Sequence, residues 1–336
     1  MKDILFRHSQ AVLSDAVVKV AAISIRNEKI EKIRHVAKET DLTRQIDFDG
    51  LSIFSGFIDV HIHGAIGIDV NAADTDGLFK IAEFLARNGV TAWVPTLVPD
   101  SDENYRRAIV AIDKLMEIQV DQPVAQALGV HYEGVFANEK MCGALRPEFF
   151  KTFSNNRADL TATEENHPVA PTTPSSPTTP AFGHPSSDRR GALKPPLLSQ
   201  GEELIGLPRL KKGVHMTTLA PEIEGGIELI KELVRQGWIC SIGHTKADID
   251  ILDQALAAGV QHLTHFYNAM TGLHHRNLGV VGWALTNEAV TFDIIADGVH
   301  VCSRASEDAR ICLPRQITRQ SFAHQRFRGA DRFGRW

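Results

Sequence analysis

The stretch GFIDVHIHGAIGIDVNAADTDGLFKIAEFLARNGVTAWVPTL, residues 56–97, sets the pattern on which the fold prediction depends. A run rich in β-branched residues precedes an amphipathic segment that ends at Gly89, and a second apolar run starts directly after that glycine. Glycine is typical of a helix C-terminus, because it adopts the left-handed backbone conformation that ends many helices. The stretch therefore predicts a strand, a helix and a second strand.

The same alternation continues along the chain. Gly237 and Gly259 close two further helical segments, at residues 223–237 and 247–259. Short apolar runs predict seven strands, at 52–63, 91–97, 126–133, 214–222, 238–245, 262–268 and 291–297. Repeated strands separated by helices predict an α/β protein with a parallel sheet. Their number favours a TIM-like (β/α) barrel, with an open doubly wound sheet as the alternative.

The composition is that of an ordinary globular protein. The 336 residues are 43% hydrophobic and 23% charged, with a formal net charge of −5. No apolar run is long enough to cross a bilayer and no signal-peptide core follows Met1, so we expect a soluble cytoplasmic protein with no membrane partner. Four widely spaced cysteines argue against a disulfide framework or a thiolate zinc site. The mildly acidic balance argues against a nucleic-acid partner.

Three segments depart from the barrel pattern predicted for residues 53–302. Residues 1–52 contain short strands around an Asn-Glu turn and predict a small β appendage. Eight of the 15 prolines lie between Pro168 and Pro196, so we predict that residues 154–200 form a disordered insertion. The last segment, 303–336, holds eight arginines and no lysine, without a strand or helix period. It predicts an atypical tail, and hence a barrel that is incomplete after its seventh strand.

Polar side chains recur where the predicted strands end, which is the end of such barrels that carries the chemistry. His61 and His63 are two residues apart and therefore point to the same side of a strand. Glu133, His244 and His265 follow three later strands. Each residue alone could be a strand-end group that faces solvent or caps a helix. Together, one carboxylate and two imidazoles predict a catalytic zinc site, because they leave a position open for water.

The strings GFIDVHIHG, GVHYEGVFAN, TLAPE, GHTKAD, THFYNAM and IADGVHV resemble, in order and spacing, the N-acetylglucosamine-6-phosphate deacetylases of the amidohydrolase superfamily. The resemblance covers residues 56–301, interrupted by the predicted insertion. It implies a metal-dependent TIM-like barrel beside a small β-sandwich built from both chain ends, of which residues 1–52 would be the N-terminal half. It also implies the deacetylation of N-acetylglucosamine 6-phosphate to glucosamine 6-phosphate and acetate.

The resemblance assigns roles to individual residues. It makes Glu133, His244 and His265 the ligands of a divalent metal, most plausibly zinc, and makes His61 and His63 a second metal site. It implies that the substrate is bound by Ala144, Asn268, Ala269, Arg276 and His300. In a homodimer, Arg276 would reach the phosphate in the site of the neighbouring subunit.

Two features depart from the family. The family takes its general base from an aspartate of the eighth strand, and no Thr-Asp-Ala string follows Val301; Asp331 is late enough but has no strand pattern around it. A change of reading frame or a wrong gene boundary would explain this. Leu145 stands where the family usually has a substrate-contacting histidine. The sequence therefore leaves two alternatives: a truncated, inactive product that at most binds metal or sugar phosphate, and a related metal-dependent amidase or lactonase.

Overall fold

A computed structural model describes residues 4–13, 16–27, 29–34, 44–153, 206–295 and 297–302. The predicted insertion at 154–200 and the predicted tail at 303–336, with Asp331, lie outside the described residues. The predictions for these two segments therefore stay predictions.

The main sheet is parallel and curls into an incomplete TIM-like barrel, as the sequence predicts. In spatial order its strands are β6 (Phe57–Ile62), β9 (Val90–Leu97), β10 (Gln126–Ala127) with β11 (Gly129–Phe136), β12 (Val214–Leu219), β13 (Ile239–Ile242), β14 (His262–Leu263) and β15 (Thr291–Phe292). β10 and β11 follow one another along the same side of β9. Since β10 and β11 share one position, the sheet has the seven strand positions that the sequence predicts. Within the described residues β6 and β15 end the sheet.

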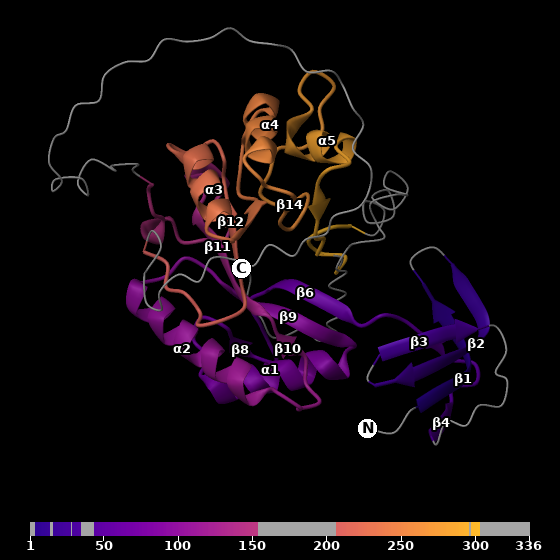
Figure 1. The fold of residues 1–336 in the computed structure, drawn as a ribbon. Helices are drawn as coiled ribbons and strands as arrows, with labels where there is room; N and C mark the ends of the chain where they lie inside the picture. Colours follow the sequence, from indigo (N-terminus) through magenta and orange to yellow (C-terminus); the bar gives the residue numbers. More distant parts are fainter. Residues whose placement is uncertain are drawn as a thin grey trace, which may run out of the picture.

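Helices follow the strands and cover the outside of the curl (Figure 1). They are α1 (Thr75–Arg87), α2 (Asp102–Ile118), α3 (Gly226–Arg235), α4 (Ile249–Ala257) and α5 (Gly279–Thr286). Gly89, Gly237 and Gly259 follow the ends of α1, α3 and α4 with φ values of 83°, 81° and 113°. The predicted helix ends are confirmed, because only the left-handed conformation lets the chain turn back toward the sheet at these points.

Several strands are shorter than predicted. The predicted strand 262–268 ends at Leu263, and the predicted strand 291–297 ends at Phe292. After β14 the backbone turns, with positive φ at His265, Tyr267 and Ala269. These residues leave the ladder to bond neighbouring strand ends instead: the Thr245 amide donates to the Ala269 carbonyl. The predicted strand 52–63 is likewise two strands, of which the first, β5 (Ser52–Ile53), pairs with β1 of the N-terminal sheet.

The described residues between 4 and 53 form a separate small sheet. Its strands β1 (Ile4–Val12), β2 (Val17–Arg26), β3 (Lys29–Arg34) and β4 (Arg44–Asp47) lie in the order β3-β2-β1-β4, with β5 also on β1. β2 and β3 flank the predicted turn, where Asn27 has a φ of 49°. The predicted β appendage is thus present, while the domain limits stay predictions.

A short hairpin, β7 (Gly64–Ala65) and β8 (Ile68–Asp69), follows β6 of the main sheet.

Within the described residues no helix is both long enough and apolar enough for a bilayer crossing.

Gln119 gives a test of how the helices are fastened to the barrel. It is 6% exposed at the end of α2, where its Oε1 accepts from the Ala127 amide at 2.7 Å and its Nε2 donates to the Ala127 carbonyl at 2.9 Å. Gln119→Leu leaves both groups buried without partners, so we expect the free energy of unfolding to fall by about 2–4 kcal/mol. Urea denaturation measures this, with the exposed Gln122→Leu as the control. Equal stability of the two variants would contradict the fastening role.

Candidate metal centre

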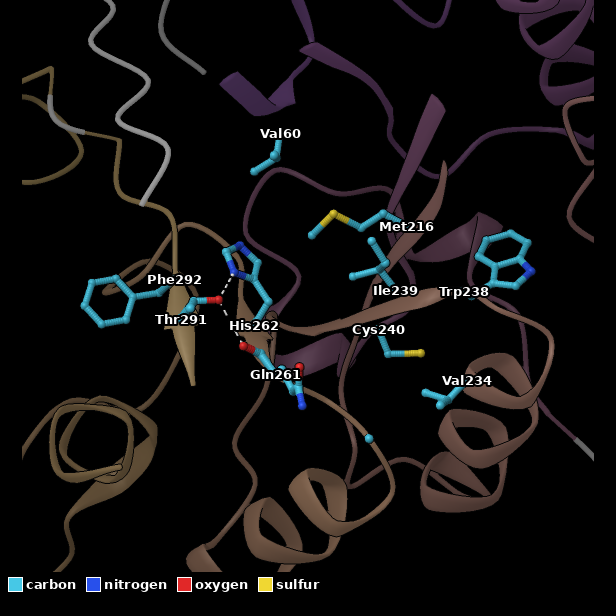
Figure 2. A pocket seen from close by; sticks show the side chains of 11 residues that line it. Val60, Met216, Val234, Trp238, Ile239, Cys240, Gln261, His262, Thr291 and Phe292 are labelled. Carbon is cyan, nitrogen blue, oxygen red and sulfur yellow. Dashed lines mark hydrogen bonds between the residues drawn. The ribbon is translucent and has the colours of Figure 1, made fainter. Parts of the chain in front are cut away.

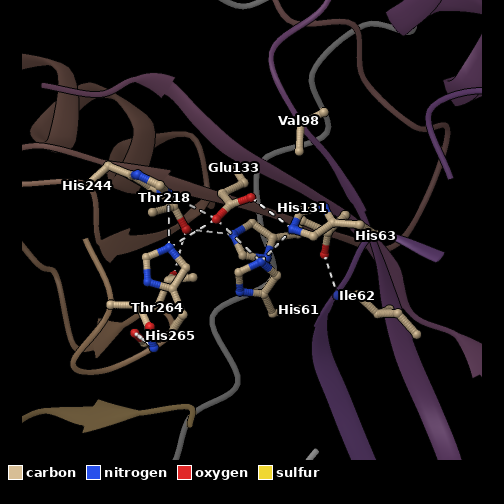
Figure 3. A network of polar contacts seen from close by, with 12 residues as sticks. His61, Ile62, His63, Val98, His131, Glu133, Thr218, His244, Thr264 and His265 are labelled. Atoms are coloured by element: carbon tan, nitrogen blue, oxygen red, sulfur yellow. Dashed lines mark hydrogen bonds and ion pairs between the residues drawn. The ribbon is translucent and has the colours of Figure 1, made fainter. Parts of the chain in front are cut away.

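The five residues predicted to be metal ligands meet at one point, at the carboxyl ends of the barrel strands (Figure 3). We call these five residues the His/Glu cluster. Glu133 of β11 lies at its centre, and its Oε1 is 3.1 Å from His244 Nε2 and 3.0 Å from His265 Nε2. Its Oε2 is 3.0 Å from His63 Nε2, and its Oε1 is 3.4 Å from His61 Nε2.

The cluster divides into two groups that share the carboxylate. One consists of Glu133, His244 and His265, all buried; the other consists of Glu133, His61 and His63, of which His63 is exposed. In each group the ligand atoms lie within 4.8 Å of one another. The pairs His244/His265 and His61/His63 each bring two Nε2 atoms to 2.9 Å. In the His244/His265 pair the two nitrogens repel at this distance when neither Nε2 carries a proton, and a divalent cation bound by both removes the repulsion. The donor set therefore fits a divalent metal.

The backbone at His244 and His265 is unusual. Their φ values are 49° and 39°, in the left-handed region that side chains other than glycine rarely occupy. Such a residue costs of the order of 1–3 kcal/mol and is found mainly at functional sites. Here the conformation turns both rings from the ends of β13 and β14 toward Glu133.

The hydrogen bond of His244 fixes which ring nitrogen can bind a cation. Its Nδ1 is 2.8 Å from the Met141 carbonyl oxygen, which can only accept, so Nδ1 carries the proton. The Nε2 lone pair of His244 is then free to point at the centre of the cluster. A backbone carbonyl in this position is a common partner of metal-ligating histidines.

Charge in the cluster is strongly coupled. Burial disfavours the ionised form of Glu133, but His61 and His63 together with the bonds from His244 and His265 hold its pKa well below the usual range. Burial opposes protonation of His61, yet the Glu133 and Asp293 carboxylates raise its pKa to about 10. Within the described structure the Nδ1 atoms of His61 and His265 are buried without a hydrogen-bond partner. The metal-free cluster thus holds an excess of imidazole nitrogens around one carboxylate.

Sequence reasoning missed a buried layer beneath the cluster. His131 Nδ1 donates to the Val60 carbonyl at 2.9 Å, and its Nε2 accepts from the Thr218 hydroxyl at 2.7 Å. Thr264 and Ser241 extend this chain of hydroxyl bonds. Burial lowers the pKa of His131 to about 3, so the ring stays neutral. Because Val60 directly precedes His61, the layer fixes the strand that carries His61 and His63.

Glu222 of the TLAPE string was also missed, and the structure gives this string a physical role. The Glu222 carboxylate accepts from Asn138 Nδ2 at 2.8 Å, from the Thr245 hydroxyl and from the Lys246 amide at 2.6 Å. The Asn138 amide in turn donates to the His244 carbonyl. One carboxylate therefore ties the ends of β11, β12 and β13 together around His244. The sequence signal was its position directly after a strand.

Two further acidic residues lie close to the cluster. Asp293 follows β15, is 5% exposed and has its Oδ2 3.8 Å from His61 Nδ1. Asp59 of β6 is 2% exposed, accepts from the His61 amide, and has a pKa that burial raises to about 6. A lone aspartate inside an apolar strand run, as in TFDII, was the signal available for Asp293.

The residues predicted to bind substrate are less closely gathered. Asn268 and Ala269 follow His265 on the turn after β14, and the Asn268 amide donates to the His265 carbonyl. Ala144 is exposed on the loop whose Met141 holds His244. Arg276 and His300 are exposed on separate loops, and His300 bonds Asp297 at 2.7 Å. In the described part of the chain neither forms a hydrogen bond or ion pair with the cluster.

Leu145, at the position where a polar residue was expected, is buried and packs against Gly134, next to Glu133. It contributes an apolar wall beside the cluster.

A cavity of about 410 Å³ lies elsewhere, near the amino ends of the later strands (Figure 2). Met216, Ile239 and Phe292 contribute to a mostly apolar lining, with Val60 of β6 on the opposite side. Chemistry in parallel barrels belongs to the carboxyl ends of the strands, so this cavity is not the candidate site.

Comparisons with known proteins agree with the fold. No family model matches the chain. The chain is 28% identical over 309 residues to an N-acetylglucosamine-6-phosphate deacetylase of Bacillus subtilis, with 89% of this chain and 65% of the relative covered. It is 31% identical over 266 residues to the protein of that name from Danio rerio, with 76% of this chain and 54% of the relative covered.

A solved structure shares the fold. The N-acetylglucosamine-6-phosphate deacetylase of Pasteurella multocida superposes with a TM-score of 0.67 at 23% identity, covering 93% of this chain and 68% of that one. The chain therefore spans between about half and two thirds of the length of the curated relatives described above. Along most of its length the chain is therefore similar in sequence to N-acetylglucosamine-6-phosphate deacetylases, and it shares the fold of a solved protein of that name.

Proposed function

We propose that the chain is a metal-dependent hydrolase that removes acetate from N-acetylglucosamine 6-phosphate. The observation that carries the proposal is the convergence of four imidazoles on the buried Glu133 carboxylate at the end of the barrel where chemistry is expected. The substrate is that named for the Bacillus subtilis and Danio rerio relatives. No observation favours the alternatives of an inactive product or of a different amidase or lactonase.

Zinc is the metal we propose for the Glu133, His244 and His265 group. Two atoms that both ligate one tetrahedral zinc at about 2.0–2.1 Å lie about 3.3 Å apart. The three ligand atoms of this group are separated by 3.1, 3.0 and 2.9 Å, so a small expansion would accommodate the ion. His61 and His63 would hold a second, weaker cation, since they share Glu133 with the first.

The residues of the chain would act by position. A bound divalent cation polarises an amide carbonyl and makes a water molecule acidic enough to attack it. His244 is held for this role with its Nε2 lone pair toward the cation by the Met141 carbonyl. Glu222 keeps the neighbouring strand ends together, and Leu145 limits the access of bulk water beside Glu133. Little reorganisation is then needed when substrate binds.

The sugar phosphate would lie across the same end of the barrel. We propose Asn268 and Ala269, beside His265, and His300 as contacts to the sugar phosphate, with the backbone of Ala144 as a further contact to the substrate. Arg276 offers a planar guanidinium matched to phosphate oxygens, and its exposure is compatible with contact to a neighbouring subunit. The homodimer and the cytoplasmic location stay predictions.

The first test of this function is metal retention. The double variant His244→Ala/His265→Ala removes two of three ligands of the buried group, so we expect it to lose the tightly bound zinc equivalent. His61→Ala is expected to weaken only a second equivalent. Equilibrium dialysis followed by metal analysis measures both. The exposed loop pair His274→Ala/His275→Ala also removes two imidazoles and serves as the control. Full zinc retention by the cluster double variant would refute the ligand assignment.

The second test is acetate release from N-acetylglucosamine 6-phosphate by the zinc-loaded chain. The resemblance assigns proton transfer to an eighth-strand carboxylate that is not among the described residues. We therefore expect turnover about 10²- to 10⁴-fold slower than that of the Bacillus subtilis relative assayed beside it. The remaining activity should disappear in His265→Ala and persist in His275→Ala, which removes an exposed loop imidazole. Activity that survives His265→Ala unchanged would mean that the cluster is not the catalytic site.

A further inference from the structure

Asp293 is a buried carboxylate next to the His/Glu cluster that has no role in the proposed function. It follows β15, and its backbone continues the sheet, because its amide donates to the Leu263 carbonyl and its carbonyl accepts from the Phe266 amide. Its side chain turns inward, with Oδ2 accepting from the His265 amide at 2.9 Å and Oδ1 bonded to His262 Nε2 at 3.0 Å. Asp293 therefore grips the end of β14 on both sides of His265.

His265 depends on this grip. With a φ of 39° it has left the ladder, so its buried amide has lost the strand partner that a regular backbone would give it. The Asp293 carboxylate supplies the replacement acceptor. Without it, a donor would be buried unpaired and the left-handed conformation that aims the ring at Glu133 would lose its support.

The same carboxylate faces a second ring of the His/Glu cluster. His61 directs Nε2 toward Glu133 and His63, while its Nδ1 is buried and has no hydrogen-bond partner among the described residues. Asp293 Oδ2 lies 3.8 Å from this Nδ1, at ion-pair distance. Metal-ligating histidines commonly give their other ring nitrogen to a carboxylate or a carbonyl. Asp293 faces the Nδ1 atom of His61 as the Met141 carbonyl faces that of His244, but at 3.8 Å instead of the 2.8 Å of a hydrogen bond.

A chain of hydrogen bonds through His262 holds the Asp293 carboxylate in place. His262, which bonds its Oδ1, has its other ring nitrogen 2.9 Å from the Thr291 hydroxyl, and Thr291 donates to the Gln261 carbonyl at 3.0 Å (Figure 2). This chain lies on the wall of the cavity at the amino ends of the strands. The carboxylate is thereby fixed in direction and cannot turn away from the cluster.

We propose that Asp293 is the positioning residue of the metal centre, setting the direction of His265 through its backbone amide and of His61 through its ring. The proposal rests on the metal-binding function proposed above. Asp293 acts through these two histidines: its Oδ2 holds the His265 amide and faces His61 Nδ1, while its Oδ1 is bonded to His262.

The test compares Asp293→Ala with the nearly isosteric Asp293→Asn in the full chain. The measurement is the affinity for the first and second zinc equivalents, by competition with a chromophoric chelator. Asp293→Ala should weaken the first equivalent by about 10- to 100-fold, the usual effect of losing a partner of a metal ligand. Asp293→Asn keeps an acceptor for the His265 amide but not the charge opposite His61. It should hold the first equivalent close to wild type and lose affinity for the second.

The control separates positioning from stability. Asp253 of α4 accepts from the buried Trp283 Nε1 at 2.8 Å, away from the cluster, so Asp253→Ala should lower the melting temperature with both zinc affinities unchanged. Wild-type zinc binding together with unchanged affinities in both Asp293 variants would overturn the positioning role alone. Failure of the wild-type chain to bind zinc would instead overturn the metal-binding function on which it rests.

Discussion

The burial of the Glu133 carboxylate is the constraint on which the functional end of this barrel depends. An ionised carboxylate in the interior is very costly unless charged or hydrogen-bonding partners surround it. Here the partners are imidazoles from the end of β6 and from the turns after β13 and β14, so several strand ends must converge on one residue of β11. The irregular backbone at His244 and His265 follows from this requirement, because a regular strand could not aim both rings at the same atom.

Around the cluster, contacts from other elements support its residues. The Met141 carbonyl holds His244, the hydroxyl chain under His131 holds the strand of His61, and Glu222 joins three strand ends. These supports lie far apart in sequence but meet within the barrel. These hydrogen bonds keep the side chains of the cluster oriented, which lowers the entropy cost of binding an ion or a ligand there.

The two ends of the barrel differ in chemistry. The carboxyl ends of the strands carry the charged cluster, whereas the amino ends surround an apolar cavity between β12–β15 and Val60 of β6. His262 and Thr291 connect the wall of this cavity to Asp293, and through it to His265 and His61. The geometry of the His/Glu cluster is thus coupled to packing at the opposite end of the same strands.

The sequence alone predicted the strand–helix alternation, the glycine helix ends and the five cluster residues, because each depends on local period or on a short motif such as HxH. It did not predict that β14 ends at Leu263 or that Asp293, His131 and Glu222 support the cluster. The apolar sequence continues past the residue at which a strand ends, so it does not mark where the backbone turns to pair with distant polar groups. A single buried aspartate or histidine has no periodic signature. Those features were decided by tertiary structure, because only the packing of the strands side by side determines which buried polar groups meet and must be paired.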